Sequence, residues 1–154
     1  MNGSTPPVFP PGLRHSTLFH IEGALRIIQR RMEAVTAERL GLCVRECLIL
    51  QAASSVPPWT QGFIADCLGV NRNVMVLATD SLEKRGYVRR ERRRENRREQ
   101  SIMLTAKGKR TVKALEKLRA ETWHEVFRPT TAEQRELLMK WGRAVIEGDA
   151  PVSK

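Results

Sequence analysis

Helix-capping residues and glycines divide residues 60–86 into two short helices, and this punctuation constrains the fold more than any other feature. Thr60 and Asn71 are residue types that cap helix N-termini, and each precedes a stretch with apolar residues at helical spacing. Gly69 and Gly86 follow these stretches, as glycine does when the residue after a helix is left-handed. The sequence therefore predicts helices over 61–68 and 72–85, joined as a helix-turn-helix.

The pattern changes to short strands after this unit. Residues 87–90 and 100–104 flank the arginine-rich stretch ERRRENRRE, residues 91–99, so they predict a β-hairpin, or wing. Helices are expected over 17–37 and 44–53 before the unit, over 106–127 after it, and again after a capping box at 130–133. The predicted fold class is mainly α with a small β-hairpin wing.

The first and last helices carry one-sided apolar stripes. In the first helix the apolar positions alternate between spacings of three and four residues. A stripe of this length needs another helix to cover it, and the spacing does not decide between a helix of the same chain and one of a second copy. The positions are Leu18, Ile21, Leu25, Ile28, Met32 and Val35 in the first helix, and Leu137, Leu138, Trp141 and Val145 in the last.

The charge imbalance of the chain lies in one segment. The whole chain has 27 basic and 17 acidic residues, a formal net charge of +10. Residues 84–119 contain 15 of the basic and 4 of the acidic residues, so they carry +11 and the rest of the chain carries −1. Concentrated positive charge favours a polyanionic partner, because binding releases counterions from nucleic acid.

Other classes of protein find no support in the sequence. No apolar run approaches the roughly 18 residues of a membrane span. Residues 1–16 contain four prolines and no apolar stretch typical of a secretory signal, so we expect a cytoplasmic protein with its cysteines as thiols. Neither the scattered histidines nor the glycines form a pattern typical of metal binding, nucleophilic catalysis or phosphate binding. We therefore expect no metal, no cofactor and no enzymatic activity.

Four stretches, taken in order, resemble the multiple antibiotic resistance regulator (MarR) family. They are Leu68-Gly-Val-Asn71, Leu82-Glu-Lys-Arg-Gly-Tyr-Val-Arg-Arg90, Asn96-Arg-Arg98 and Leu104-Thr-Ala-Lys-Gly108. The resemblance covers about residues 18–146 and implies a homodimeric winged helix-turn-helix regulator of transcription, most often a repressor. It also implies that the first and last helices form the dimer interface, and that two heads bind half-sites about one helical turn apart on double-stranded DNA.

The chain is thus expected to consist of a flexible arm (1–16), one domain (17–147) and a flexible tail (148–154). Within the domain, 17–37 and 106–147 are assigned to dimerisation and 44–105 to the winged helix-turn-helix. The expected dimer contacts are Leu18, Ile21, Leu25, Ile28, Leu138, Trp141 and Val145.

DNA-binding residues are expected in two groups. The second helix of the helix-turn-helix should read base edges, whereas the wing and the start of the preceding helix should hold phosphates and the minor groove. The first group is Asn71, Arg72, Asn73, Val76 and Leu77. The second group is Thr60, Gln61, Arg90, Arg92, Arg93, Arg94, Arg97 and Arg98.

Two positions depart from the family pattern. Asn96 stands where relatives usually have an aspartate that orients the wing arginine, here Arg98, so its supporting hydrogen bond should be weaker. Val76 and Leu77 stand where polar residues are common and should point outward, because the apolar run 74–78 cannot be buried on one helix face. Two interpretations stay open for this pair: less specific DNA contact, or apolar readout of thymine methyl groups.

Regulation also stays open. The resemblance implies release from DNA by a small aromatic acid or phenolic compound, with His20 and Trp59 as candidate pocket residues, or by oxidation of Cys43 or Cys47. Each of these residues has a plainer interpretation as a packing or surface residue. Cys67 is expected inside the helix-turn-helix core. A basic nucleic-acid-binding protein without a regulatory ligand is the alternative function.

Overall fold

The computed structural model describes residues 10–56, 58–92, 100–128 and 130–148. This part of the chain is mostly helical with one two-stranded antiparallel sheet, which confirms the predicted fold class. In chain order the elements are α1 (Pro11–Arg14), α2 (Thr17–Leu40), α3 (Val44–Ala53), α4 (Gln61–Cys67), α5 (Arg72–Lys84), β1 (Val88–Arg92), β2 (Gln100–Leu104), α6 (Ala106–Val126) and α7 (Ala132–Gly148).

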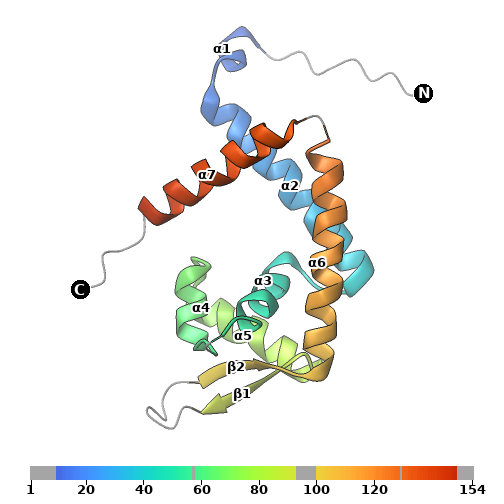
Figure 1. The fold of residues 1–154 in the computed structure, drawn as a ribbon. Coiled ribbons are helices and arrows are strands. Elements are labelled where there is room, and N and C mark those ends of the chain that lie inside the picture. Colours follow the sequence, from blue (N-terminus) through green and yellow to red (C-terminus); the bar gives the residue numbers. More distant parts are fainter. Residues whose placement is uncertain (1–9, 57, 93–99, 129, 149–154) are drawn as a thin grey trace.

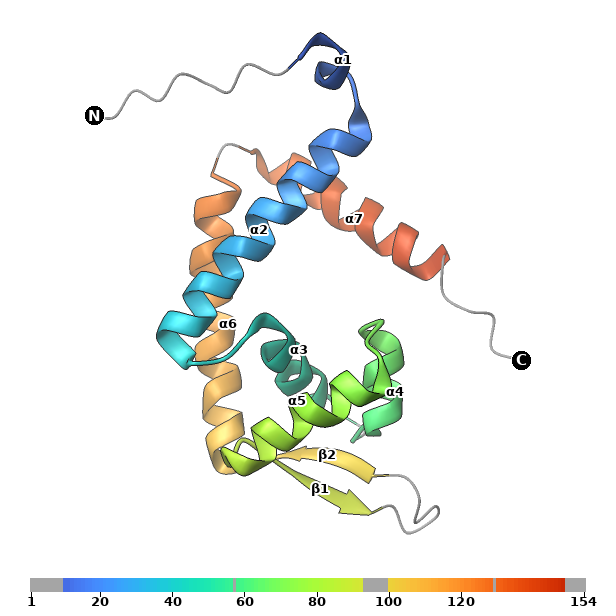
Figure 2. The ribbon, with the colours of Figure 1, turned by 180° about the vertical axis from the view of Figure 1, so that it is seen from behind.

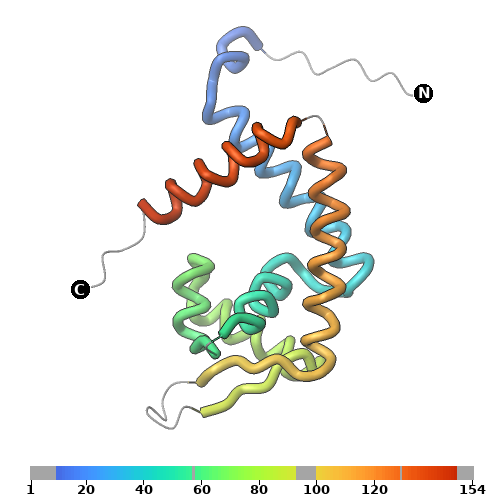
Figure 3. Tube along the Cα trace, in the orientation of Figure 1, coloured from blue at the N-terminus to red at the C-terminus, as the bar shows by residue number. Residues whose placement is uncertain are grey.

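The elements form a head and two long helices that rise from it (Figure 1). The head contains α3, α4, α5 and the sheet, while α2 and α6 pack against each other and run away from it (Figure 2). At the far end of α6 the chain turns, and α7 extends to one side (Figure 3). We call α2, α7 and the part of α6 that is remote from the sheet the base, because they lie on the side of the molecule away from the wing.

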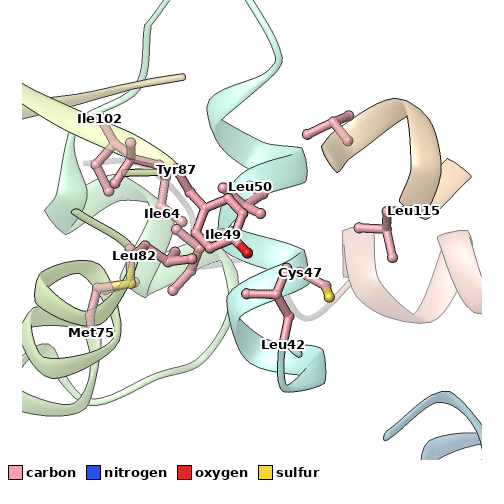
Figure 4. Packing of buried hydrophobic residues seen from close by; sticks show 13 residues of the cluster. Leu42, Cys47, Ile49, Leu50, Ile64, Met75, Leu82, Tyr87, Ile102 and Leu115 are labelled. Carbon is pink, nitrogen blue, oxygen red and sulfur yellow. The ribbon is translucent and has the colours of Figure 1, made fainter. Parts of the chain in front are cut away.

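Helix α3 lies at the centre of the hydrophobic core. Its Ile49 and Leu50 are fully buried, and apolar side chains of α4, α5, β2 and α6 surround them (Figure 4). Met75 and Leu82 lie on the buried face of α5. Burial of each such side chain contributes about 1.5–3 kcal/mol, so the core holds the helix-turn-helix firmly against the sheet and α6.

The predicted caps and turns are in place. Thr60 and Asn71 each accept a hydrogen bond from a backbone N–H in the first turn of the helix they precede, and Ser16 caps α2 in the same way. Gly69 and Gly86 have φ angles of +60° and +74°, a left-handed conformation that glycine adopts without a steric penalty. Local chemistry therefore sets both ends of α4 and α5.

The short helix α1 and the end of strand β1 differ from the sequence prediction. A short helix, Pro11–Arg14, lies within the stretch expected to form an arm, because proline suits the first position of a helix, where no N–H is needed. The first strand ends at Arg92 instead of residue 90, since its pairing continues until Arg92 lies opposite Gln100.

The capping box of α7 also differs, by one residue. Thr131 and Gln134 exchange hydrogen bonds between side chain and backbone N–H, at 2.9 and 3.3 Å. The sequence placed this box at 130–133. Thr130 is instead engaged with the end of α6, because its hydroxyl donates to the Phe127 carbonyl oxygen at 2.7 Å.

The start of α6 is fitted closely against the start of the wing. The Thr105 hydroxyl oxygen accepts the Gly108 N–H at 3.1 Å and lies 2.7 and 3.1 Å from the carbonyl oxygens of Gly86 and Tyr87. A Cβ atom at Gly108 would overlap the Tyr87 carbonyl oxygen. The Leu-Thr-x-x-Gly stretch therefore docks α6 onto the residues that lead into β1.

Candidate nucleic-acid interface

The outer face of α5 carries the residues predicted to read DNA. Helix α5 begins after Asn71, whose Oδ1 accepts a hydrogen bond from the Asn73 N–H at 2.8 Å. Arg72 and Asn73 are exposed in the first turn. Val76 is 41% and Leu77 69% exposed, which confirms that they point outward. The face thus presents polar groups at its N-terminal end and an apolar pair one turn further along.

The start of α4 lies beside the start of α5. Thr60 and Gln61 line a shallow depression of about 490 Å³ together with Arg72 of α5 and Gln100 of β2. An isolated β-bridge between Thr60 and Ser101 fixes the start of α4 against the wing. The fold thereby brings three predicted DNA-binding residues, Thr60, Gln61 and Arg72, together beside the start of β2.

Arg90 joins the wing to both helices of the helix-turn-helix. Its guanidinium forms ion pairs with Asp80 and Glu83 of α5 at 2.6 and 2.7 Å, and its side chain is only 16% exposed. Its Nε donates to Gln61 Oε1 at 3.1 Å, and its backbone N–H donates to Glu83 at 2.8 Å. Because two carboxylates already neutralise Arg90, its assignment as a phosphate contact is revised: it supports the wing.

The described part of the wing contains two more arginines. Arg92 is exposed at the end of β1. Arg89 is exposed as well and forms an ion pair with Glu91 at 2.6 Å. The other predicted wing contacts lie outside the described residues; they are Arg93, Arg94, Arg97, Arg98 and the supporting Asn96.

A buried carboxylate that the sequence analysis missed ties α3 to α5. Glu46 accepts hydrogen bonds from Ser81 Oγ at 2.9 Å and from Arg85 Nη1 at 3.2 Å, and it also accepts the Cys43 N–H at 3.2 Å. Arg85 in addition donates to the Gly41 carbonyl oxygen. One signal was present in the sequence: Glu46 lies three positions after Cys43, the residue that precedes the helix, which is the spacing of a capping box.

The three cysteines differ in exposure, and one of them, Cys67, departs from its predicted place in the core. Cys47 is buried, and burial raises the pKa of its thiol to about 11, so the reactive thiolate is disfavoured and its assignment as a redox candidate is not supported. Cys67 is exposed at the end of α4 and not in the core, because the buried face of this short helix consists of Ile64 and Ala65. Cys43 is half-buried at the start of α3.

The two candidate effector residues lie in different regions of the chain. His20 is exposed in the first turn of α2, with its Nδ1 2.8 Å from the Ser16 carbonyl oxygen. Trp59 precedes α4 and stacks on Phe63 with ring centroids 4.3 Å apart. The first turn of α2 lies at the end of the base that is remote from α4 (Figure 1), so one chain does not bring this pair together.

The terminal helices expose much of their apolar surface. No residue of α7 is buried. Ile21 and Ile28 of α2 are half-buried. The other predicted dimer contacts are 42–67% exposed; they are Leu18, Leu25, Leu138, Trp141 and Val145.

The described ranges contain neither a membrane-spanning helix nor a cluster of metal-binding side chains. None of the helices is long and apolar enough to cross a membrane. Within the same residues, no group of three or more His, Cys, Asp or Glu side chains could hold a metal ion.

Comparison with known proteins finds similarity to one family. The model of the MarR family matches residues 44–100, from the start of α3 to the start of β2. A crystal structure of MarR is 25% identical with a TM-score of 0.76, covering 88% of this chain and 92% of that chain. None of the curated proteins matches the chain.

Two further solved structures share the fold. The transcriptional repressor CouR bound to a 23-mer DNA duplex is 24% identical with a TM-score of 0.81, covering 90% of this chain and 98% of that chain. CouR from Rhodococcus jostii RHA1 bound to p-coumaroyl-CoA is 17% identical with a TM-score of 0.79, covering 94% of this chain and 100% of that chain.

Proposed function

The chain belongs to the MarR family of transcriptional regulators, and from this premise we propose that it is a homodimeric repressor. The dimer binds a pseudo-palindromic site in double-stranded DNA, and a small aromatic or phenolic ligand releases it from that site. In this role the chain binds and releases DNA and catalyses no reaction. The exposed face of α5 is the observation that carries the proposal.

Helix α5 suits the major groove in shape and chemistry. Its buried face is anchored in the core, while its other face is open and its N-terminal turn presents Arg72 and Asn73. Base edges are read by such side chains at the start of a recognition helix. Val76 and Leu77 follow one turn later, at a position from which they can contact thymine methyl groups. The positive segment 84–119 adds attraction to phosphates.

The exposed apolar surface of α2 and α7 supports the dimer. Large apolar patches on a soluble protein usually mark an interface, and here they lie on the two terminal helices. A second copy would cover them and place two α5 helices on one duplex. Release by a small ligand is proposed from the family, in which CouR has been solved both with DNA and with p-coumaroyl-CoA.

Selection of bound fragments from random double-stranded DNA tests this proposal. We expect an enriched pseudo-palindrome with half-sites about one helical turn apart. Sequencing of the bound fraction after repeated rounds is the measurement. If the protein binds DNA but enriches no sequence, it coats nucleic acid without regulating a particular site, and the repressor proposal fails.

A further inference from the structure

A groove of about 560 Å³ lies where the sheet meets α6 (Figure 1) and the turn that follows α3. Arg89 of β1 and Met103 of β2 line the groove on the side of the sheet. Lys109 and Lys113, in the first two turns of α6, line it on the side of that helix. Residues 53–56, at the end of α3 and in the turn, form a third wall. Three segments that are far apart in the sequence therefore share one surface.

The groove lies on the side of the sheet that faces away from α5. Successive side chains of a strand point to opposite faces of a sheet. Arg90 forms ion pairs with Asp80 and Glu83 of α5, so its neighbour Arg89 points to the other face. Met103 is the register partner of Arg89 in β2 and shares that face. The groove is therefore separated by the sheet from the helix that is proposed to enter DNA.

A row of exposed cations continues from the groove along α6. The row consists of Lys109, Arg110, Lys113 and Lys117, whose spacing keeps them on one side of a helix, away from the buried Leu115. Within the part of the chain that the structure describes, none of the four forms an ion pair. Helix α6 starts at the sheet and runs away from the wing (Figure 2), so a duplex that lies across α5 and the wing would not follow this row.

The groove also exposes apolar surface. Val56 is 90% exposed at its edge, and Met103 and Leu104 are half-buried in its lining. Phosphate groups gain nothing from such surface, whereas apolar side chains of a protein gain about 25 cal/mol for each Å² that they bury. Glu116 is the acidic residue of the lining and stands against three cations. A protein segment that carries both carboxylates and apolar side chains is therefore complementary to the whole groove.

We propose that an acidic segment of another protein docks in this groove as a short amphipathic helix. Its carboxylates pair with Lys109 and Lys113, and its apolar side chains lie against Val56 and Met103. Because the groove lies on the far side of the sheet from α5, the segment and DNA can be bound at the same time. The inference goes beyond the proposed function: it assigns a surface through which a second protein meets the regulator, and the contact itself needs no DNA.

Fluorescence anisotropy of a labelled peptide titrated with the full chain tests the surface. The probe has about 15 residues, enough for a marginal helix, and carries glutamate and leucine at helical spacing. We expect it to bind, and the combined variant Lys109→Gln with Lys113→Gln to weaken binding by about tenfold or more, because two charge-assisted contacts are lost. The matched control is Arg30→Gln with Arg31→Gln, which removes the same charge from exposed positions of α2 outside the groove and should leave peptide binding unchanged. Thermal unfolding shows that each variant is folded.

Three results would overturn the proposal: no binding of the peptide, an equal loss in the control variant, or equally tight binding of a peptide with serine in place of leucine. DNA as the occupant is tested on the selected duplex. If the combined variant of Lys109 and Lys113 lowers the salt dependence of DNA binding by about two units, these lysines contact phosphates and DNA covers the surface instead. Binding of the peptide by a protein that binds no DNA at all counts against the proposed function and not against the groove.

Discussion

Gly108 leaves no room for a side chain where α6 passes the wing, since an added Cβ would overlap the Tyr87 carbonyl oxygen. Backbone atoms move less readily than side chains, so we expect Gly108→Ala to lower the free energy of unfolding by about 1–3 kcal/mol. Gly23→Ala in α2 is the control, because nothing lies within 4 Å of its added Cβ and alanine favours helix. Denaturant unfolding of both variants is the measurement, and equal stability of the two would contradict the close fit at Gly108.

Cys47 makes the stability of the fold depend on alkaline pH. Its pKa is raised by burial from 9.0 to about 11, so the folded chain keeps this proton at a pH where the unfolded chain loses it. The stabilisation is fully present below pH 9 and is lost as the pH rises toward 11, on the order of 2 kcal/mol in all. Cys47→Ala should lack this slope, although it is less stable throughout. Unfolding curves of both proteins from pH 8 to 11 measure this difference in pH dependence. If the free energy of unfolding falls equally with pH in the unaltered protein and in Cys47→Ala, the prediction is wrong.

Contacts between elements, and not the wing arginines alone, determine how firmly the wing is held against α5. Arg90→Ala removes the ion pairs to Asp80 and Glu83 and leaves both carboxylates uncompensated. We expect unfolding to become easier by about 1–3 kcal/mol and DNA binding to weaken on every duplex, because the wing loses its orientation. Arg89→Ala on the same strand removes only an exposed pair, worth about 0–1 kcal/mol. Equal losses of stability and DNA affinity in the two variants would show that the missing positive charge causes the effect, and not the position of Arg90 between the wing and α5.

The apolar pair on α5 gives a sharper test of base readout. If Val76 and Leu77 contact thymine methyl groups, Val76→Ala or Leu77→Ala should weaken binding only to duplexes that carry thymine at the contacted positions. Uracil at those positions removes the same methyl groups and should reproduce the effect. Arg72→Ala should instead relax the preference for a base at one half-site position, by about 1–3 kcal/mol. If uracil has no effect, Val76 and Leu77 do not read thymine methyl groups and form a DNA-facing surface of low specificity.

The elements that sequence predicts well are those that local chemistry delimits. Thr60, Asn71, Gly69 and Gly86 act on their own neighbours, and the predicted bounds of α4 and α5 are right within one residue. Arg90 could not be assigned in this way, because its acceptors Asp80, Glu83 and Gln61 surround it only after β1 has packed on α5.

Hydrogen bonds between residues far apart in the sequence could not be predicted either. Glu46 bonds to Ser81 and Arg85, which are 35 and 39 residues away, and no spacing rule links such positions. Spacing therefore predicted helices, whereas pairing across the fold had to be observed.

For the whole molecule, the proposed dimer makes a direct prediction. Light scattering at micromolar concentration should give twice the chain mass of 17.5 kDa. Leu25→Glu with Ile28→Glu places charge in the apolar stripe of α2 and should yield the single-chain mass together with weaker DNA binding. Val56→Glu is the control, since Val56 is 90% exposed in the turn between α3 and α4. A single-chain mass for the unaltered protein would remove the two-headed binding arrangement.

Helix α7 has no buried residue in one chain, so covering its apolar face by a second chain depends on the concentration of the protein in a cell. When paired chains are the minority, their amount follows the square of the total concentration, so halving the protein lowers the paired form about fourfold. The DNA occupancy of a repressor assembled in this way depends more steeply on its own abundance. For the proposed dimeric repressor, dilution by growth would therefore relieve repression sooner than it would for a monomeric binder, without any ligand.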